Sequence, residues 1–110
     1  MRTFRVKVFG RVQGVFFRKN VKEIADELCL KGGVKNCSDG CVEIIVEGSE
    51  EKLEEFILKI KESPGVSKVE ELKVRKIVDG NFKSFEIVKE ESFFRDKKNA
   101  VGNLGKRLFG

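Results

Sequence analysis

The chain has 110 residues, of which 40% are hydrophobic and 37% are charged. This length fits one compact domain, and the hydrophobic content excludes a disordered chain. No apolar stretch approaches the roughly 18–20 residues of a membrane-spanning helix, and the first residues lack the apolar core of a signal peptide, so we expect a cytoplasmic protein without a membrane partner.

The net charge of +5 is distributed unevenly along the chain. Residues 1–90 carry 18 basic and 16 acidic side chains, whereas residues 91–110 carry five basic and two acidic ones. A body this close to neutral argues against a nucleic-acid-binding surface, which needs many phosphate contacts. We therefore expect one domain over residues 1–90, followed by a basic, aromatic-containing C-terminal extension over residues 91–110.

The three cysteines, Cys29, Cys37 and Cys41, are an odd number and include no C-x2-C pair. In a reducing compartment such residues are expected to be free thiols that pack as small hydrophobic side chains. Asp39 and Glu43 flank a turn and a strand, where we expect them to be solvated. The sequence therefore shows no clustered set of metal ligands.

The first third of the chain predicts a strand followed by a helix. Residues 3–9 alternate as in a half-buried strand, and residues 10–14 break the pattern with two glycines. Apolar residues at helical spacing then predict an amphipathic helix over residues 17–30, which Gly32 and Gly33 would stop.

The next segment predicts a tight hairpin and a second helix. Residues 34–37 predict a short strand, and the Ser-Asp-Gly sequence at 38–40 supplies the positive φ angle of a tight turn. The returning strand covers residues 41–47. Ser49 is a suitable N-cap for a second amphipathic helix, which Pro64 ends.

The last part of the body predicts two strands joined by a turn. Residues 66–78 predict a long strand, residues 79–81 a turn, and residues 82–88 a returning strand with Phe85 and Ile87 in the core. The element order is β-α-β-β-α-β with an extra C-terminal hairpin strand. This order predicts an α+β, ferredoxin-like sandwich in which two helices cover one face of an antiparallel sheet.

The loop between the first strand and the first helix is suited to bind an anion. Its glycines let consecutive backbone N–H groups turn inward, and the helix N-terminus adds partial positive charge. Arg18, in the first helical turn, can grip the same anion bidentately. On these grounds alone, a Gly-x-x-x-Gly loop before a helix is equally often only a turn.

Two segments resemble the signatures of a known family. Residues 10–18 (GRVQGVFFR) resemble the first signature of the acylphosphatase family, and residues 33–43 (GVKNCSDGCVE) resemble the second. Both stand in the family's order on matching elements, and the similarity covers about residues 3–88. The sequence departs from the family at Cys29, where glycine is frequent, and at Gly33, where an aromatic residue is common.

The resemblance implies an enzyme that hydrolyses acyl phosphates by direct attack of a water molecule. Arg18 would bind the phosphoryl group, Asn36 would hold the attacking water through its side-chain carbonyl, and Asp39 and Gly40 would be structural. The phosphate-binding residues implied are Gln13, which would shape the loop, together with Gly14, Val15, Phe16, Phe17 and Arg18. We expect the side chains of Phe16 and Phe17 themselves to lie in the core.

The residue inventory agrees with this reaction. The chain has no histidine and no tyrosine, and an arginine with backbone and asparagine amides is neither a good acid nor a good base near neutral pH. A carboxylate leaving group, whose parent acid has a pKa around 4, departs without protonation. Acyl phosphates are therefore favoured over phosphate monoesters, no metal or organic cofactor is expected, and inorganic phosphate or sulfate should bind as an inhibitor.

Three alternatives share the predicted fold. An RNA-binding module would need stacking aromatic residues on the strand at 41–47, and a metal-chaperone module would need a C-x2-C pair; both features are missing. A catalytically silent acylphosphatase-like interaction domain stays open, with residues 91–110 as its working part. That extension could also pack or swap between copies and so form a homo-oligomer.

Overall fold

The computed structural model describes residues 1–88 apart from positions 15 and 79. The elements are β1 (Arg2–Arg11), α1 (Phe17–Glu27), β2 (Lys31–Asn36), β3 (Val42–Gly48), α2 (Glu50–Lys61), β4 (Lys68–Ile77) and β5 (Phe85–Ile87). The expected extension over residues 91–110 lies outside the described residues.

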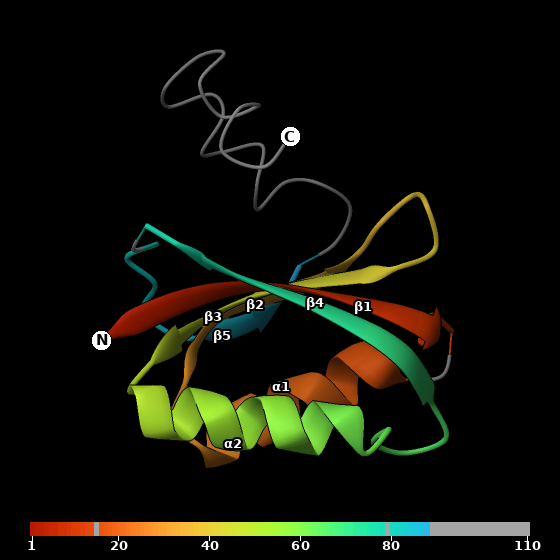
Figure 1. The fold of residues 1–110 in the computed structure, drawn as a ribbon, viewed down its shortest axis with the longest axis horizontal. Helices are drawn as coiled ribbons and strands as arrows, with labels where there is room; N and C mark the ends of the chain where they lie inside the picture. Colours follow the sequence, from red (N-terminus) through yellow and green to blue (C-terminus); the bar gives the residue numbers. More distant parts are fainter. Residues whose placement is uncertain (15, 79, 89–110) are drawn as a thin grey trace.

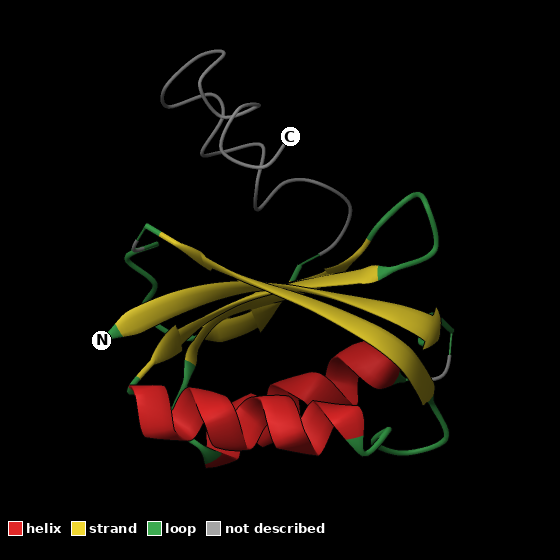
Figure 2. Cartoon of the chain, in the orientation of Figure 1, coloured by secondary structure: helices red, strands yellow, loops and turns green. Residues whose placement is uncertain are grey.

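The strands form one sheet, and both helices lie on the same face of it (Figures 1 and 2). The strand order is β4-β1-β3-β2-β5, and the neighbours among the first four strands are antiparallel. Two helices on one face of such a sheet confirm the predicted ferredoxin-like α+β fold. Among the described helices, none is long and apolar enough to cross a membrane.

The last strand corrects the predicted C-terminal hairpin. β5 does not return along β4 but crosses to the opposite edge of the sheet, where it runs parallel to β2 with Phe85 beside Gly32. There Phe85 is buried, whereas Ile87, also predicted as core, is 37% exposed. The residues at 79–81 predict only that the chain changes direction. The edge of the sheet that β5 joins depends on where the strand can both form backbone hydrogen bonds and bury the ring of Phe85.

The end of α1 also differs from the prediction, because Gly32 and Gly33 lie inside β2 and do not stop the helix. The helix ends earlier, with the Leu30 N–H donating to the Ala25 carbonyl and Cys29 in the left-handed conformation at φ 59°. This is the Schellman geometry, in which glycine usually occupies the left-handed position. The left-handed backbone conformation therefore explains why glycine is frequent in the family at the position of Cys29.

Gly32 is required inside the sheet. Its φ is +137°, and a Cβ atom at this position would lie 1.8 Å from the carbonyl oxygen of Ile45 on β3. A side chain there would force the two strands apart, so glycine permits the close approach of β2 to β3.

The core fills the space between the helices and the sheet. Its apolar residues with at most 1% exposure are Val6, Val8, Val12, Phe17, Val21, Ala25, Val34, Val42, Ile44, Val46, Leu53, Phe56, Ile60 and Phe85. Apart from Val12, in the loop after β1, they come from both helices and from the strands. This burial holds in place the start of α1 and the end of β2, on which the site is built.

Candidate active site

A pocket of about 290 Å³ opens where the start of α1 meets the end of β2. Pockets of about 300 Å³ are at the small end of the range for small-molecule sites. The residues that line it are Val12, Gly14, Phe16, Phe17, Arg18, Lys19, Asn36 and Ile87. The pocket therefore brings together residues from both segments that the sequence singled out.

The start of α1 presents positive charge to this pocket. Phe16, at the N-cap position, adopts a left-handed conformation (φ 59°, ψ 22°), and no side chain among the described residues caps the helix. A left-handed residue directly before a helical one turns successive N–H groups to one side, as in an anion-binding nest. No acidic residue lies in the first turn, whereas Arg18 and Lys19 both line the pocket.

Asn36 is the last residue of β2, where it pairs with Val42 of β3. Its side-chain oxygen Oδ1 is buried and has no hydrogen-bond partner, the sole such side-chain atom among the described residues. An unsatisfied buried amide oxygen costs about 1–3 kcal/mol. Because Asn36 also lines the pocket, a bound water or ligand is the natural partner for this acceptor.

Gln13 connects the two segments. Its Nε2 donates to the carbonyl oxygens of Cys37 at 2.9 Å and Cys41 at 2.7 Å, on the turn between β2 and β3. This side chain does not line the pocket. It ties the loop before α1 to the turn after Asn36, so it connects the two segments that line the pocket.

The comparison with known proteins agrees with this geometry. A sequence model of the family named Acylphosphatase matches residues 4–87. The chain belongs to the acylphosphatase family. The match spans both signature segments and every described strand and helix of the sandwich at least in part.

Individual acylphosphatases are similar over most of their length. The acylphosphatase of Syntrophotalea carbinolica is 46% identical over 84 residues, which cover 76% of this chain and 91% of that protein. The acylphosphatase of Clostridium acetobutylicum is 40% identical over 89 residues, covering 80% and 98%. The crystal structure of acylphosphatase from Bacillus subtilis matches with a TM-score of 0.77 at 42% identity, covering 80% of this chain and 99% of that one.

Of the site residues that the family resemblance implied, one lies outside the described residues and another is placed differently than predicted. Val15 is not among the described residues. Phe17 is buried as predicted, but Phe16 is 79% exposed at the pocket and is not a core residue. Its position at the left-handed helix start directs its ring away from the core, which helical spacing alone does not reveal.

Three residues that line the pocket, Val12, Lys19 and Ile87, were not among the predicted site residues. Val12 lies inside the first signature segment, which was the signal for it. Lys19 directly follows Arg18, and its place in the first helical turn was an available signal. Ile87 had no such signal, because it reaches the pocket only through the crossing of β5 to the edge beside β2.

The turn between β2 and β3 is closed by Asp39, which fits the structural role expected of it. The backbone N–H of Cys41 donates to Asp39 Oδ1 at 3.1 Å, and hydrogen bonding from Cys41 lowers the pKa of the Asp39 carboxyl. Gly40 occupies the left-handed region at φ +95°, as the Asp-Gly turn predicted. Glu43, in contrast, is not solvated: it is buried and forms an ion pair with Arg5.

The three thiols differ in exposure. Cys41 is 1% exposed, Cys37 is half-buried, and burial raises the pKa of both thiols. Cys29 is exposed at the end of α1, so its expected packing as a small hydrophobic side chain is wrong.

Proposed function

We propose that this protein hydrolyses acyl phosphates in the pocket between α1 and β2. Arg18 and the backbone N–H groups at the start of α1 bind the phosphoryl group, and Asn36 holds the attacking water. Family membership supports the activity, and the pocket geometry supports the residue roles. A cytoplasmic location and inorganic phosphate as a competing ligand belong to the same proposal.

The observation that carries the proposal is the unpartnered Oδ1 of Asn36 in the pocket that Arg18 also lines. A carbonyl oxygen can only accept a hydrogen bond, and a water molecule can supply one. A water held there lies in the same pocket as an anion at Arg18. This arrangement positions a nucleophile beside a phosphoryl group, which is the main requirement of phosphoryl transfer.

The phosphoryl group finds complementary charge at the start of α1. The first N–H groups of a helix have no intrahelical acceptor, and no side chain caps them in α1. The guanidinium of Arg18 adds a planar, permanently charged donor that matches phosphate oxygens. These fixed donors would stabilise the charge that spreads over the phosphoryl oxygens in the transition state.

The chemistry needs no acid or base from the pocket wall. Among the described residues that line the pocket, none carries a carboxylate, a thiol or an imidazole, and the ammonium group of Lys19 is a cation that cannot act as a base. The water oxygen attacks phosphorus, the bond from phosphorus to the acyl oxygen breaks, and the carboxylate leaves with the electron pair. The proton of the attacking water passes to a phosphoryl oxygen of the substrate, which gives inorganic phosphate. A weakly basic leaving group permits this route.

Hydrolysis of benzoyl phosphate tests the proposal directly. Arg18→Ala should lower kcat/KM by at least about 10²-fold and abolish competition by inorganic phosphate. Asn36→Ala should lower kcat by about 10²–10³-fold while phosphate still competes. Arg75→Ala, on the exposed strand β4, is the matched control for loss of one arginine and should hydrolyse normally.

Two outcomes would contradict the proposal. Near-normal turnover by either pocket variant would remove that residue from its assigned role. A wild-type protein that binds phosphate without hydrolysing any acyl phosphate would instead be a silent interaction domain.

A further inference from the structure

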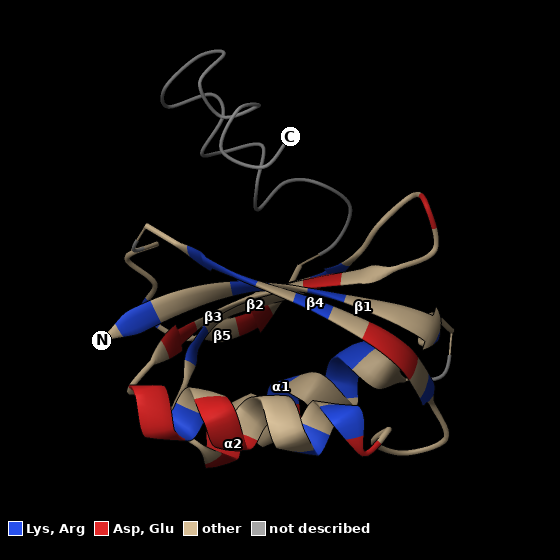
Figure 3. Cartoon of the chain, viewed as in Figure 1, with Lys and Arg blue, Asp and Glu red and all other residues tan. Residues whose placement is uncertain are grey.

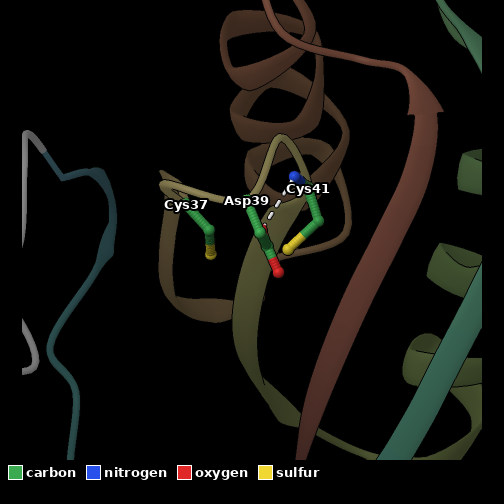
Figure 4. A group of neighbouring side chains, drawn as sticks. All are labelled: Cys37, Asp39 and Cys41. Atoms are coloured by element: carbon green, nitrogen blue, oxygen red, sulfur yellow. Dashed lines mark hydrogen bonds between the residues drawn. The ribbon is translucent and has the colours of Figure 1, made fainter.

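The turn between β2 and β3 brings together three side chains that the proposed function does not use for chemistry. Cys37, Asp39 and Cys41 each offer one donor atom, and these atoms all lie within 4.8 Å of one another. The side chains extend to the same side of the turn (Figure 4). Two thiols and a carboxylate are thus gathered within five consecutive residues.

The backbone holds this arrangement in place. The Cys37 N–H donates to the Cys41 carbonyl at 2.9 Å, and the Gly40 N–H donates to the Cys37 carbonyl at 3.2 Å. Gln13 adds its two hydrogen bonds to the same pair of carbonyls. One Asp39 oxygen closes the turn, and the other lies beside the sulfur of Cys41 (Figure 4). The backbone that carries the three donors is therefore fixed before any ion arrives, and only the side chains need to adjust.

We propose that Cys37, Asp39 and Cys41 form a site for one thiophilic divalent cation, of the chemistry of Zn²⁺. Thiolates select Zn²⁺ over hard cations such as Mg²⁺, and a carboxylate is an ordinary third ligand. Water would complete the tetrahedron. With Zn–S bonds of about 2.3 Å, tetrahedral donor atoms lie roughly 3.5–3.8 Å apart, so small side-chain rotations close the site.

Two further residues with possible donor atoms, Glu43 and Cys29, are not ligands of this site. The Cys37 thiol lies 3.8 Å from Glu43 Oε1, but Glu43 is held by its buried ion pair with Arg5. Cys29 lies at the other end of α1 from the pocket, outside the cluster. The three ligands are therefore Cys37, Asp39 and Cys41, and none of them lines the pocket of the proposed active site.

The sequence did not reveal this site because its spacing is C-x-D-x-C and contains no C-x2-C pair. The hairpin turn converts positions two and four residues apart into neighbours. The inference is independent of the roles of Arg18 and Asn36, since binding of the ion is measured without substrate.

Calorimetric titration of the full chain with Zn²⁺, under a phosphine reductant, tests the site. We expect one ion per chain in the wild type and in Cys29→Ser, the matched control for loss of one thiol. Cys37→Ser and Cys41→Ser should abolish this binding. Asp39→Asn keeps an acceptor for the turn and should weaken binding by at least about 10-fold. Mg²⁺ should not bind.

Thermal melting gives a second readout. Zn²⁺ at 100 times its dissociation constant should favour the folded state about 100-fold, which raises the melting midpoint of the wild type and of Cys29→Ser. The midpoints of Cys37→Ser and Cys41→Ser should not respond.

Alkylation of the thiols gives a third test, which uses only the wild-type protein. Because Cys41 is buried with or without an ion, the half-buried Cys37 is the reporter. Bound Zn²⁺ should slow the reaction of Cys37 with iodoacetamide relative to the zinc-free protein while Cys29 reacts fully in both, as mapped by mass spectrometry. Equal modification of Cys37 with and without Zn²⁺, unchanged binding in Cys37→Ser, or one ion shared by two chains would each overturn the proposal.

Discussion

The two helices begin in opposite ways, and the difference separates a helix start that is capped locally from one that is left uncapped beside the pocket. At α2, Ser49 adopts an extended conformation and its Oγ accepts from the Lys52 N–H at 3.3 Å, with Glu50 and Glu51 in the first turn. At α1, the N-cap is the left-handed Phe16, without a side-chain cap or an acidic residue in the first turn. Figure 3 shows acidic residues at the start of α2 and basic residues at the start of α1.

The start of α2 satisfies its own donors and compensates its own dipole, so it stabilises the fold locally. The start of α1 leaves its donors and its positive potential directed at the pocket. It is held by distant contacts instead, through the bonds of Gln13 to the β2–β3 turn. The helix start without a local cap is therefore the one at which we propose that an anion binds.

The largest expected effect in this comparison comes from removing the long-range support of α1. Gln13→Ala removes both hydrogen bonds to the turn and should lower kcat/KM for benzoyl phosphate by about 100-fold, because a shift near 1 Å is enough for such a loss. Ser84→Ala, which removes an exposed hydrogen bond to Glu86, is the control. A loss below about threefold, with normal circular dichroism, would show that the loop keeps its position without this support.

A charge exchange at equivalent positions tests whether only α1 uses its positive end for binding. Lys19 and Lys52 both occupy the third helical position, at the starts of α1 and α2. Lys19→Glu should weaken inorganic phosphate binding at least about 10-fold, since it reverses a charge beside the anion. Lys52→Glu should leave the affinity unchanged. Equal responses would mean that overall net charge, and not the start of α1, governs binding.

A third test compares the two N-caps by stability. Ser49→Ala should lower the free energy of unfolding by about 1 kcal/mol, which corresponds to a melting midpoint lower by roughly 4–8 °C. Its hydrolysis rate should be unchanged. Phe16→Ala removes no capping bond and should not show a comparable loss of stability. Matching losses in the two variants would contradict the distinction drawn between the caps.

The smallest expected effect is at the other end of α1, where a left-handed residue has no binding role. Cys29→Gly should raise the free energy of unfolding by about 0.5–1 kcal/mol, because relief of the left-handed conformation exceeds the added entropy of the unfolded chain. Cys29→Ala keeps the strained conformation and should gain nothing. Denaturant titration of both variants measures the difference, and no gain from glycine would mean that Cys29 is accommodated without strain.

The features that the sequence predicted well depend on near neighbours in the chain. Ser49 caps α2 through a residue three positions away, and the Asp-Gly turn needs only its own backbone angles. The element order, and with it the ferredoxin-like fold, is confirmed for the same reason. Arg18 and Asn36 were identified from their signature segments, and their catalytic roles stay predictions.

The features that the sequence did not reveal depend on residues far apart in the chain. β5 pairs with β2 across nearly half of the sequence, which carries Ile87 to the pocket and Phe85 into the core. Glu43 is buried because Arg5 lies within reach on β1. Such contacts exist only once the sheet has assembled, so composition and periodicity do not predict them.

By itself the amino-acid sequence determined the alternation of strands and helices, the cap of α2, the Asp-Gly turn at 38–40, and the two segments that mark the family. Only the tertiary structure decided the strand at the sheet edge, the unpartnered oxygen of Asn36 in a shared pocket, and the convergence of Cys37, Asp39 and Cys41. The physical reason is one of range: backbone angles and caps respond to residues within one turn, whereas burial and convergence of side chains require the packed sheet.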